Sequence, residues 1–137
     1  MIDGEKVVHE LVLAAPPDDV FDAFVDPVRL VAWIGITADL EPVPGGRFRF
    51  EIVPGEFCEG EYVTVDRPRH LVFTWGWTAA TFELPPGSSR VEVTLRPVDD
   101  GMSTRLRLVH YELDARNRQL HDDGWTRFLA QLQRVMR

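Results

Sequence analysis

The sequence LDARNRQLHDDGWTRFLAQLQRVMR, residues 113–137, decides the fold that we expect. Asp114 is a good helix N-cap, and no proline follows it. Apolar residues then recur three and four positions apart, which is typical of one wide stripe along an α-helix. The stripe contains Leu120, Trp125, Phe128, Leu129, Leu132, Val135 and Met136. A helix cannot bury such a stripe against itself, so we expect the preceding strands to supply an apolar surface.

The chain before this helix begins with one strand and two short helices. We expect the strand over residues 7–13 and the first helix from Pro16–Pro17 to just before Pro27. Proline suits the first turn of a helix, and the residue before a proline disfavours helical geometry. The second helix is expected from Val28 to about Trp33, ending at Gly35.

From residue 37 onward the pattern changes to that of β-strands. In RFRFEI (47–52), RVEVTLRP (90–97) and STRLRLVHY (103–111), apolar residues alternate with charged or polar ones. This alternation is typical of strands with one buried and one wet face, and hence of an antiparallel sheet. Further strands are expected over 37–40, 60–66 and 71–77, separated by proline and glycine turns. A twisted sheet of this size curls, so the long helix is expected in its concave side.

The length and the composition of the chain are those of one globular domain, residues 1–137. A formal net charge of −7 argues against nucleic acid and anionic membrane surfaces as partners. No apolar run is long enough to cross a membrane, and we see no signal peptide. Cys58 is the only cysteine, so no intramolecular disulfide forms, and we expect it to be inert. These features predict a cytoplasmic protein.

Five stretches carry a resemblance that covers nearly the whole chain in order. They are APPDDVFDAFVDPVRLVAWIG, ADLEPVPGGRFRF, GEYVTVDRPRHLVFTWGW, SSRVEVTLRP, and TRLRLVHYEL followed by HDDGWTRFLAQL. Together they resemble the START/Bet v 1-like (SRPBCC) superfamily. They are most similar to the branch related to the C-terminal domain of the activator of Hsp90 ATPase (AHSA1-like).

The resemblance implies an α+β helix-grip fold. In it, a seven-stranded antiparallel sheet wraps round a long C-terminal helix, two short helices close one end, and an apolar cavity lies between helix and sheet. Members of the superfamily bind lipids, sterols, polyketides or other hydrophobic molecules, some act on them, and some are co-chaperones. The 137 residues leave no room for the separate N-terminal Hsp90-binding domain of the eukaryotic activator.

Sheet parity singles out three polar residues for the concave side. His110 continues the inner row of its strand, His9 shares a face with apolar residues of the first strand, and Glu61 shares parity with Val63 and Val65. A polar group in a cavity can orient a ligand or act as acid or base, so His110 and Glu61 are candidate catalytic residues. The alternative is that each is wet or simply hydrogen-bonded.

No other motif points to a cofactor, a metal or covalent catalysis. Dinucleotide, phosphate-loop and paired-histidine zinc patterns are absent, and no serine has a nearby base in the sequence. His121 and Asp122 are adjacent on the helix and point in different directions, which disfavours a metal site. We therefore expect neither cofactor nor metal.

Bulky aromatic rings are numerous for a small domain. They either fill the core, as in most proteins, or line a cavity. Glycines at 60, 76 and 124 remove side chains from two strands and the long helix. Close approach of helix and sheet, or room for a ligand, would each explain them. The candidate ligand contacts are Trp33, Phe50, Phe57, Trp75, Trp77, His110, Trp125 and Phe128.

Three functions follow from these observations. The first is non-catalytic binding of a small hydrophobic ligand, lipid-like or polyketide-like, between the sheet and the C-terminal helix. The second is an enzyme of the cyclase or hydratase kind that uses His110 or Glu61 as acid or base. The third is a co-chaperone-like module with a chaperone partner in the stress response. The ligand and the oligomeric state stay open.

Overall fold

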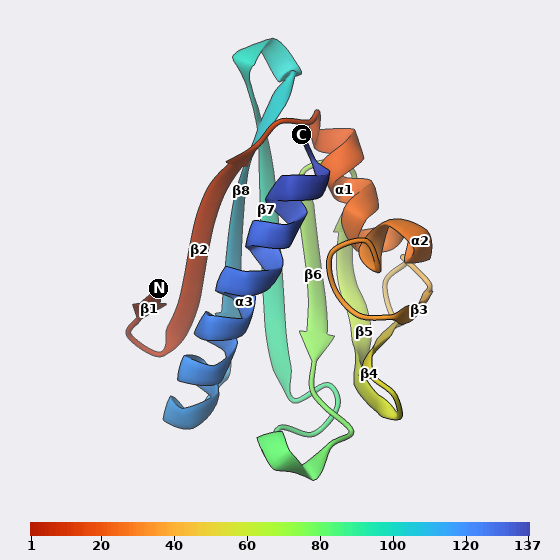
Figure 1. The fold of residues 1–137 in the computed structure, drawn as a ribbon, viewed down its shortest axis with the longest axis vertical. Coiled ribbons are helices and arrows are strands. Elements are labelled where there is room, and N and C mark those ends of the chain that lie inside the picture. The colour runs from red at the N-terminus through yellow and green to blue at the C-terminus, as the bar shows by residue number, and fades with distance from the viewer.

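The computed structural model describes all 137 residues and shows a curved sheet with one long helix on its concave face (Figure 1). All strand pairs are antiparallel, in the order β1-β2-β8-β7-β6-β5-β4-β3. This confirms the helix-grip prediction, with eight strands instead of seven because a two-residue strand precedes the first expected one. The strands are β1 Ile2–Asp3, β2 Lys6–Leu13, β3 Thr37–Leu40, β4 Arg47–Val53, β5 Glu56–Asp66, β6 His70–Trp75, β7 Ser89–Val98 and β8 Ser103–Tyr111.

Two short helices follow β2, as expected from the prolines. Asp26 separates them: its backbone N–H ends α1, and its carboxylate accepts from the N–H of Val28 at 2.9 Å to begin α2. The second helix is shorter than predicted, because residues 31–33 form turns. No helix combines the length and apolarity needed to cross a membrane. The helices are α1 Pro17–Val25, α2 Pro27–Leu30 and α3 Ala115–Val135, with 3₁₀ turns η1 Ala80–Phe82 and η2 Asp99–Gly101.

Two buried side chains fix α1 to the rest of the fold. The indole N–H of Trp33 donates to the carbonyl of Ala23 at 2.9 Å, and the hydroxyl of Tyr62 on β5 donates to the carbonyl of Phe24 at 3.0 Å. Burial of these donors requires partners, since an unpaired one costs about 1–3 kcal/mol. The two bonds hold the short helices over one end of the sheet.

The long helix α3 starts where the sequence predicts. Asp114 is its N-cap and accepts from the N–H of Asn117 at 2.8 Å. The buried face, however, is turned relative to the expected stripe: Leu120 and Val135 are 40% and 43% exposed. The face that meets the sheet contains Asn117, His121, Trp125, Leu129 and Leu132. Its first two turns therefore bury polar side chains, which apolar periodicity does not detect.

The inner face of the sheet follows the predicted alternation. On β8, Thr104, Leu106, Leu108 and His110 are all fully buried, while Arg105 between them is exposed. The predicted inner position of His110 is thus correct. Thr104 is accommodated because its hydroxyl donates to the carbonyl of Ala15 at 2.7 Å.

Two of the three notable glycines are explained by close backbone approach. A Cβ atom on Gly60 would lie 1.9 Å from the carbonyl oxygen of Thr74, and one on Gly76 would lie 1.8 Å from that of Pro85. Both distances are impossible for real atoms, so these glycines serve strand pairing and a loop crossing. They do not make room for a ligand.

We expect Gly60→Ala to lower the free energy of unfolding by about 3 kcal/mol, since the added methyl forces β5 away from β6. Urea unfolding measures this directly. The same substitution at Gly124, where a Cβ meets no atom closer than 3.9 Å, is the matched control and should not destabilise. Equal destabilisation by both substitutions would contradict the packing argument.

Candidate functional site

An apolar cleft of about 110 Å³ lies where the N-terminal half of α3 faces η1 and the end of β6. Seven of its ten lining residues are hydrophobic. We call it the α3 cleft. It is lined by Ile52, Trp75, Trp77, Phe82, Leu120, His121, Gly124, Trp125, Arg127 and Phe128.

A buried histidine joins α3 to the sheet at the bottom of this cleft. The indole N–H groups of Trp75 and Trp77 both donate to Nε2 of His121, at 3.2 and 3.0 Å. Because Nε2 accepts, the proton of a neutral ring is on Nδ1, which donates to the carbonyl of Asn117 at 2.8 Å. Both ring nitrogens of His121 are therefore occupied.

A second hydrogen-bonded histidine lies beside the first. Nδ1 of His110 accepts from the indole N–H of Trp125 at 3.1 Å, so its proton is on Nε2, which donates to Oγ of Ser89 at 2.9 Å. The Ser89 hydroxyl in turn donates to the carbonyl of Trp75 at 2.8 Å. The rings of His110 and His121 are 5.0 Å apart, so β6, β7, β8 and α3 share one buried polar network.

Burial keeps both histidines neutral. Desolvation lowers the pKa of His121 and lowers the pKa of His110 strongly, with the neighbouring His121 as a further cause for His110. Neutral rings with both nitrogens engaged position the indoles. They have no free nitrogen with which to exchange a proton with a bound molecule.

The η1 segment forms the rim of the α3 cleft and is tied to the start of α3. Nδ2 of Asn117 donates to the carbonyl of Phe82 at 2.9 Å, and the Arg116 guanidinium donates to the carbonyl of Thr81 at 2.9 Å. The Phe82 ring stacks on Trp77 with centroids 4.7 Å apart. The loop carrying η1 thus contributes an aromatic wall to the cleft.

Gly124 has no packing reason to be a glycine. Its nearest neighbour to a built Cβ is a ring carbon of Phe128 at 3.9 Å, which is ordinary contact. Glycine in a helix costs about 1 kcal/mol relative to alanine. Of the two explanations open for this residue, space in the cleft fits and close approach to the sheet does not.

The predicted aromatic contacts divide between two places. Trp75, Trp77, Trp125 and Phe128 line the α3 cleft. Trp33 and Phe50 instead line an all-apolar void of about 10 Å³, which is near the limit for a single water. His110 does not line the cleft and has no exposed surface.

Glu61 is not in the interior, so the prediction that it faces the cavity is wrong. Cys58 and Tyr62 are the fully buried residues of β5, which places Glu61 on the outer face, where it is exposed. The β5–β6 pairing is irregular between Tyr62 and Thr64. Val65 therefore packs inward while Val63 is 48% exposed, so parity counted back from Val65 gives the wrong face.

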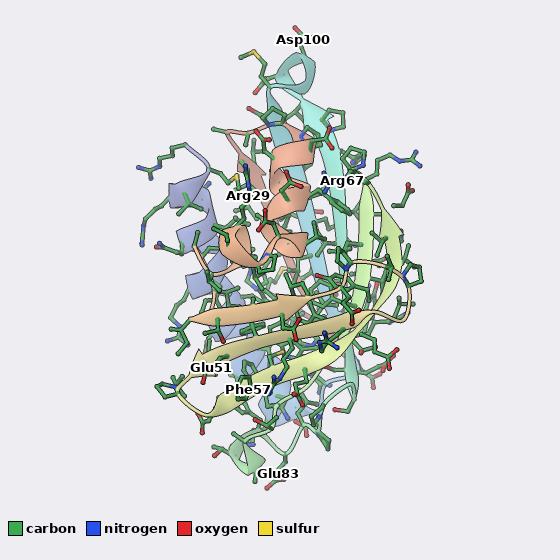
Figure 2. The ribbon with its side chains drawn as sticks, turned by 90° about the vertical axis from the view of Figure 1, so that its right-hand side faces the viewer. Arg29, Glu51, Phe57, Arg67, Glu83 and Asp100 are labelled. Carbon is green, nitrogen blue, oxygen red and sulfur yellow. The ribbon has the colours of Figure 1, made fainter.

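Phe57 is also on the outer face, so its predicted ligand contact is wrong. It is adjacent to the buried Cys58 and therefore points the other way. The Arg49 guanidinium lies over its ring at 3.9 Å. Figure 2 labels Phe57 and its cross-strand neighbour Glu51 on the strands nearest the viewer.

His9 lies apart from the cleft, at the contact between β2 and α3. Its Nε2 is 2.9 Å from the carboxylate of Asp122, which also pairs with the N-terminal ammonium of Met1. The described chain contains no group of three or more metal-ligating side chains. Asp122 is thus engaged in an ion pair and not near a metal-binding set.

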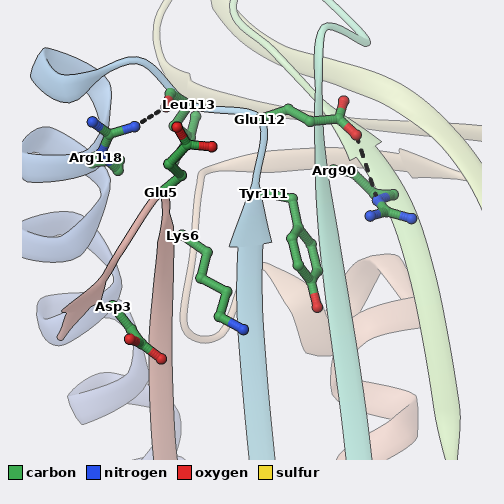
Figure 3. A pocket seen from close by; sticks show the side chains of 8 residues that line it. All are labelled: Asp3, Glu5, Lys6, Arg90, Tyr111, Glu112, Leu113 and Arg118. Carbon is green, nitrogen blue, oxygen red and sulfur yellow. Dashed lines mark hydrogen bonds and ion pairs between the residues drawn. The ribbon is translucent and has the colours of Figure 1, made fainter.

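A larger surface hollow lies elsewhere and is polar (Figure 3). It measures about 540 Å³ and is open, with Lys6, Arg90 and Arg118 beside Asp3, Glu5 and Glu112. Arg118 donates to the carbonyl of Leu113 at 2.7 Å, and Arg90 lies 3.8 Å from Glu112. Only two of its eight lining residues are hydrophobic, so the α3 cleft is the better candidate site for an apolar molecule.

Sequence reasoning missed the polar half of the site. Asn117, His121, Trp125 and Leu129 recur at intervals of four, and this row could have been found by allowing polar residues on the buried face. Phe82 and Ser89 lie in or next to a loop, so no periodicity marks them.

Comparison with known proteins identifies the family of the chain. A family model described as activator of Hsp90 ATPase homolog 1-like protein matches residues 14–137. No curated protein sequence matches the chain.

Solved structures agree with this match. Protein MLL2253 from Mesorhizobium loti is 25% identical with a TM-score of 0.82, covering 95% of each chain. The Aha1 dimer from Colwellia psychrerythraea is 16% identical with a TM-score of 0.79, covering 96% of this chain and 95% of that one. PFC0360w, an Hsp90 activator from Plasmodium falciparum, is 19% identical with a TM-score of 0.73, covering 96% of each.

We expect the free energy of unfolding to fall as the pH drops below about 6.5. His110 and His121 have a lowered pKa when folded, so the unfolded chain binds more protons in this range. Stability is fully present above the unfolded pKa and lost toward the folded one, with a slope of up to about 1.4 kcal/mol per pH unit for each histidine.

Urea unfolding between pH 5 and 8 measures this slope. Burial also lowers the pKa of His9, so His9→Gln is the control that removes its share. In that background, His121→Asn should reduce the slope further, and an unchanged slope would contradict a neutral buried His121.

Proposed function

The chain belongs to the activator of Hsp90 ATPase homolog 1-like family, within the START/Bet v 1-like superfamily, and we propose that it binds a small apolar molecule in the α3 cleft. The observation that carries this proposal is Gly124. It is a destabilising residue in the middle of α3, has no steric cause, and lines an apolar space. An alanine would fit at this position without a clash, so packing does not require a glycine. The absence of a side chain leaves open space in the cleft, and this supports a binding role for that space.

The size of the cleft supports a ring-sized occupant. Pockets for drug-sized ligands measure about 300–1,000 Å³, well above the 110 Å³ of the α3 cleft. A dry engineered cavity of about 150 Å³ binds benzene. The ligand is therefore a single aromatic ring or a short aliphatic group, and a sterol or long lipid would require η1 to move.

The hydrogen bonds of the cleft favour binding over catalysis. His121 and Arg127 are its only ionisable lining residues, and both ring nitrogens of His121 have partners. His110, the candidate acid or base of the cyclase-like alternative, is fully buried with both nitrogens engaged. An enzyme would need a free group within reach of its substrate.

Toluene binding tests the proposal. Saturation-transfer NMR and the fluorescence of the cleft tryptophans measure it. We expect saturable binding to the wild-type protein and its loss in Gly124→Leu, whose side chain occupies the cleft. Thr126→Leu adds the same side chain at an exposed position of α3 and should leave binding unchanged.

Unfolding curves of both variants establish that they are folded. Wild-type protein that fails to bind toluene would overturn the proposal. So would a folded Gly124→Leu variant that binds as the wild type does.

A second candidate function is a co-chaperone role, which family membership favours. The similar structure from Plasmodium falciparum is described as an Hsp90 activator. If this chain acts in the same way, a bacterial Hsp90 should hydrolyse ATP several times faster in its presence. An unchanged ATPase rate at saturating concentrations of this chain would exclude that role, and heat-denatured chain is the control.

A further inference from the structure

The α3 cleft contains one formal charge. Among its ten lining residues, Arg127 is cationic, none is acidic, and burial lowers the pKa of His121 so that its ring is neutral. This is unusual in a chain whose net charge is −7. Arg127 is therefore the only formal charge among the residues that line the cleft.

The Arg127 guanidinium has no partner within the chain. No hydrogen bond and no ion pair engages it, and it is exposed. Asp123, one turn earlier on α3, accepts instead from the side chain of Gln119 at 3.1 Å. An exposed residue that also lines the cleft lies at its mouth, so Arg127 is free to meet a group of a bound molecule there.

The tryptophan side chains inside the cleft have no free N–H group for a bound molecule. The N–H groups of Trp75 and Trp77 are taken by His121, and that of Trp125 is taken by His110. A ligand atom that needs a hydrogen bond would be left unpaired inside, which costs about 1–3 kcal/mol. The bound part must therefore be apolar, and any polar group of the ligand must project to the mouth.

From these two facts we infer that the ligand is a small apolar acid, with its hydrocarbon part in the α3 cleft and its anionic group paired with Arg127. This inference rests on the proposed binding function and specifies the ligand class. The apolar walls exclude polar ligands, and the single cation at the mouth favours a carboxylate over a neutral group of the same shape.

Phenylacetate and phenylacetamide test the inference, because they share one ring and differ mainly in charge. We expect phenylacetate to bind wild-type protein about threefold to fivefold more tightly than phenylacetamide does. This is the gain in affinity that an exposed ion pair typically gives. Arg127→Gln should reduce this ratio to about one while toluene binding persists. Arg134→Gln, an exposed arginine two turns further along α3, is the matched control and should keep the preference.

The outcomes separate the two proposals. Equal affinity of wild-type protein for acid and amide, with toluene still bound, overturns the acid inference and leaves the cleft function in place. A preference that survives Arg127→Gln overturns the assignment to Arg127. Absence of binding by toluene and by both phenyl compounds overturns the cleft function itself.

Discussion

The structure depends on one acceptor atom, Nε2 of His121, which receives the N–H groups of two tryptophans. These bonds fix α3 to β6 at a depth where unpaired donors would be costly. They also orient the indoles edge to face, with centroids 5.4 Å apart, so that the rings form a wall instead of collapsing into the space beside Gly124. The polar network therefore maintains an apolar cleft.

The same network engages every ring nitrogen of the two buried histidines. His110 and His121 are neighbours in the core, and each uses both ring nitrogens to hold side chains or backbone in place. Burial makes either cation unfavourable, and the neighbouring His121 lowers the pKa of His110 further, so the rings remain neutral at physiological pH. These residues hold the indoles of the cleft in fixed positions.

Most of the fold could be predicted from the sequence because it depends on periodicity and on strong local signals. Alternation placed the strands, Asp114 and the prolines placed the helix starts, and His110 was assigned to the correct face. Parity failed for Glu61, because a pairing irregularity in β5 changes the phase. Apolar periodicity also missed His121, since its burial depends on hydrogen bonds from Trp75 at the end of β6 and from Trp77, two residues further on.

Binding of an apolar molecule requires that the space beside Gly124 is dry and accessible from solvent. Crystals of the wild-type protein under xenon pressure test it directly, because xenon enters empty apolar cavities of this kind. We expect a xenon atom between Gly124, Trp77 and Phe128. No xenon at this position, or ordered water hydrogen-bonded there instead, would contradict it.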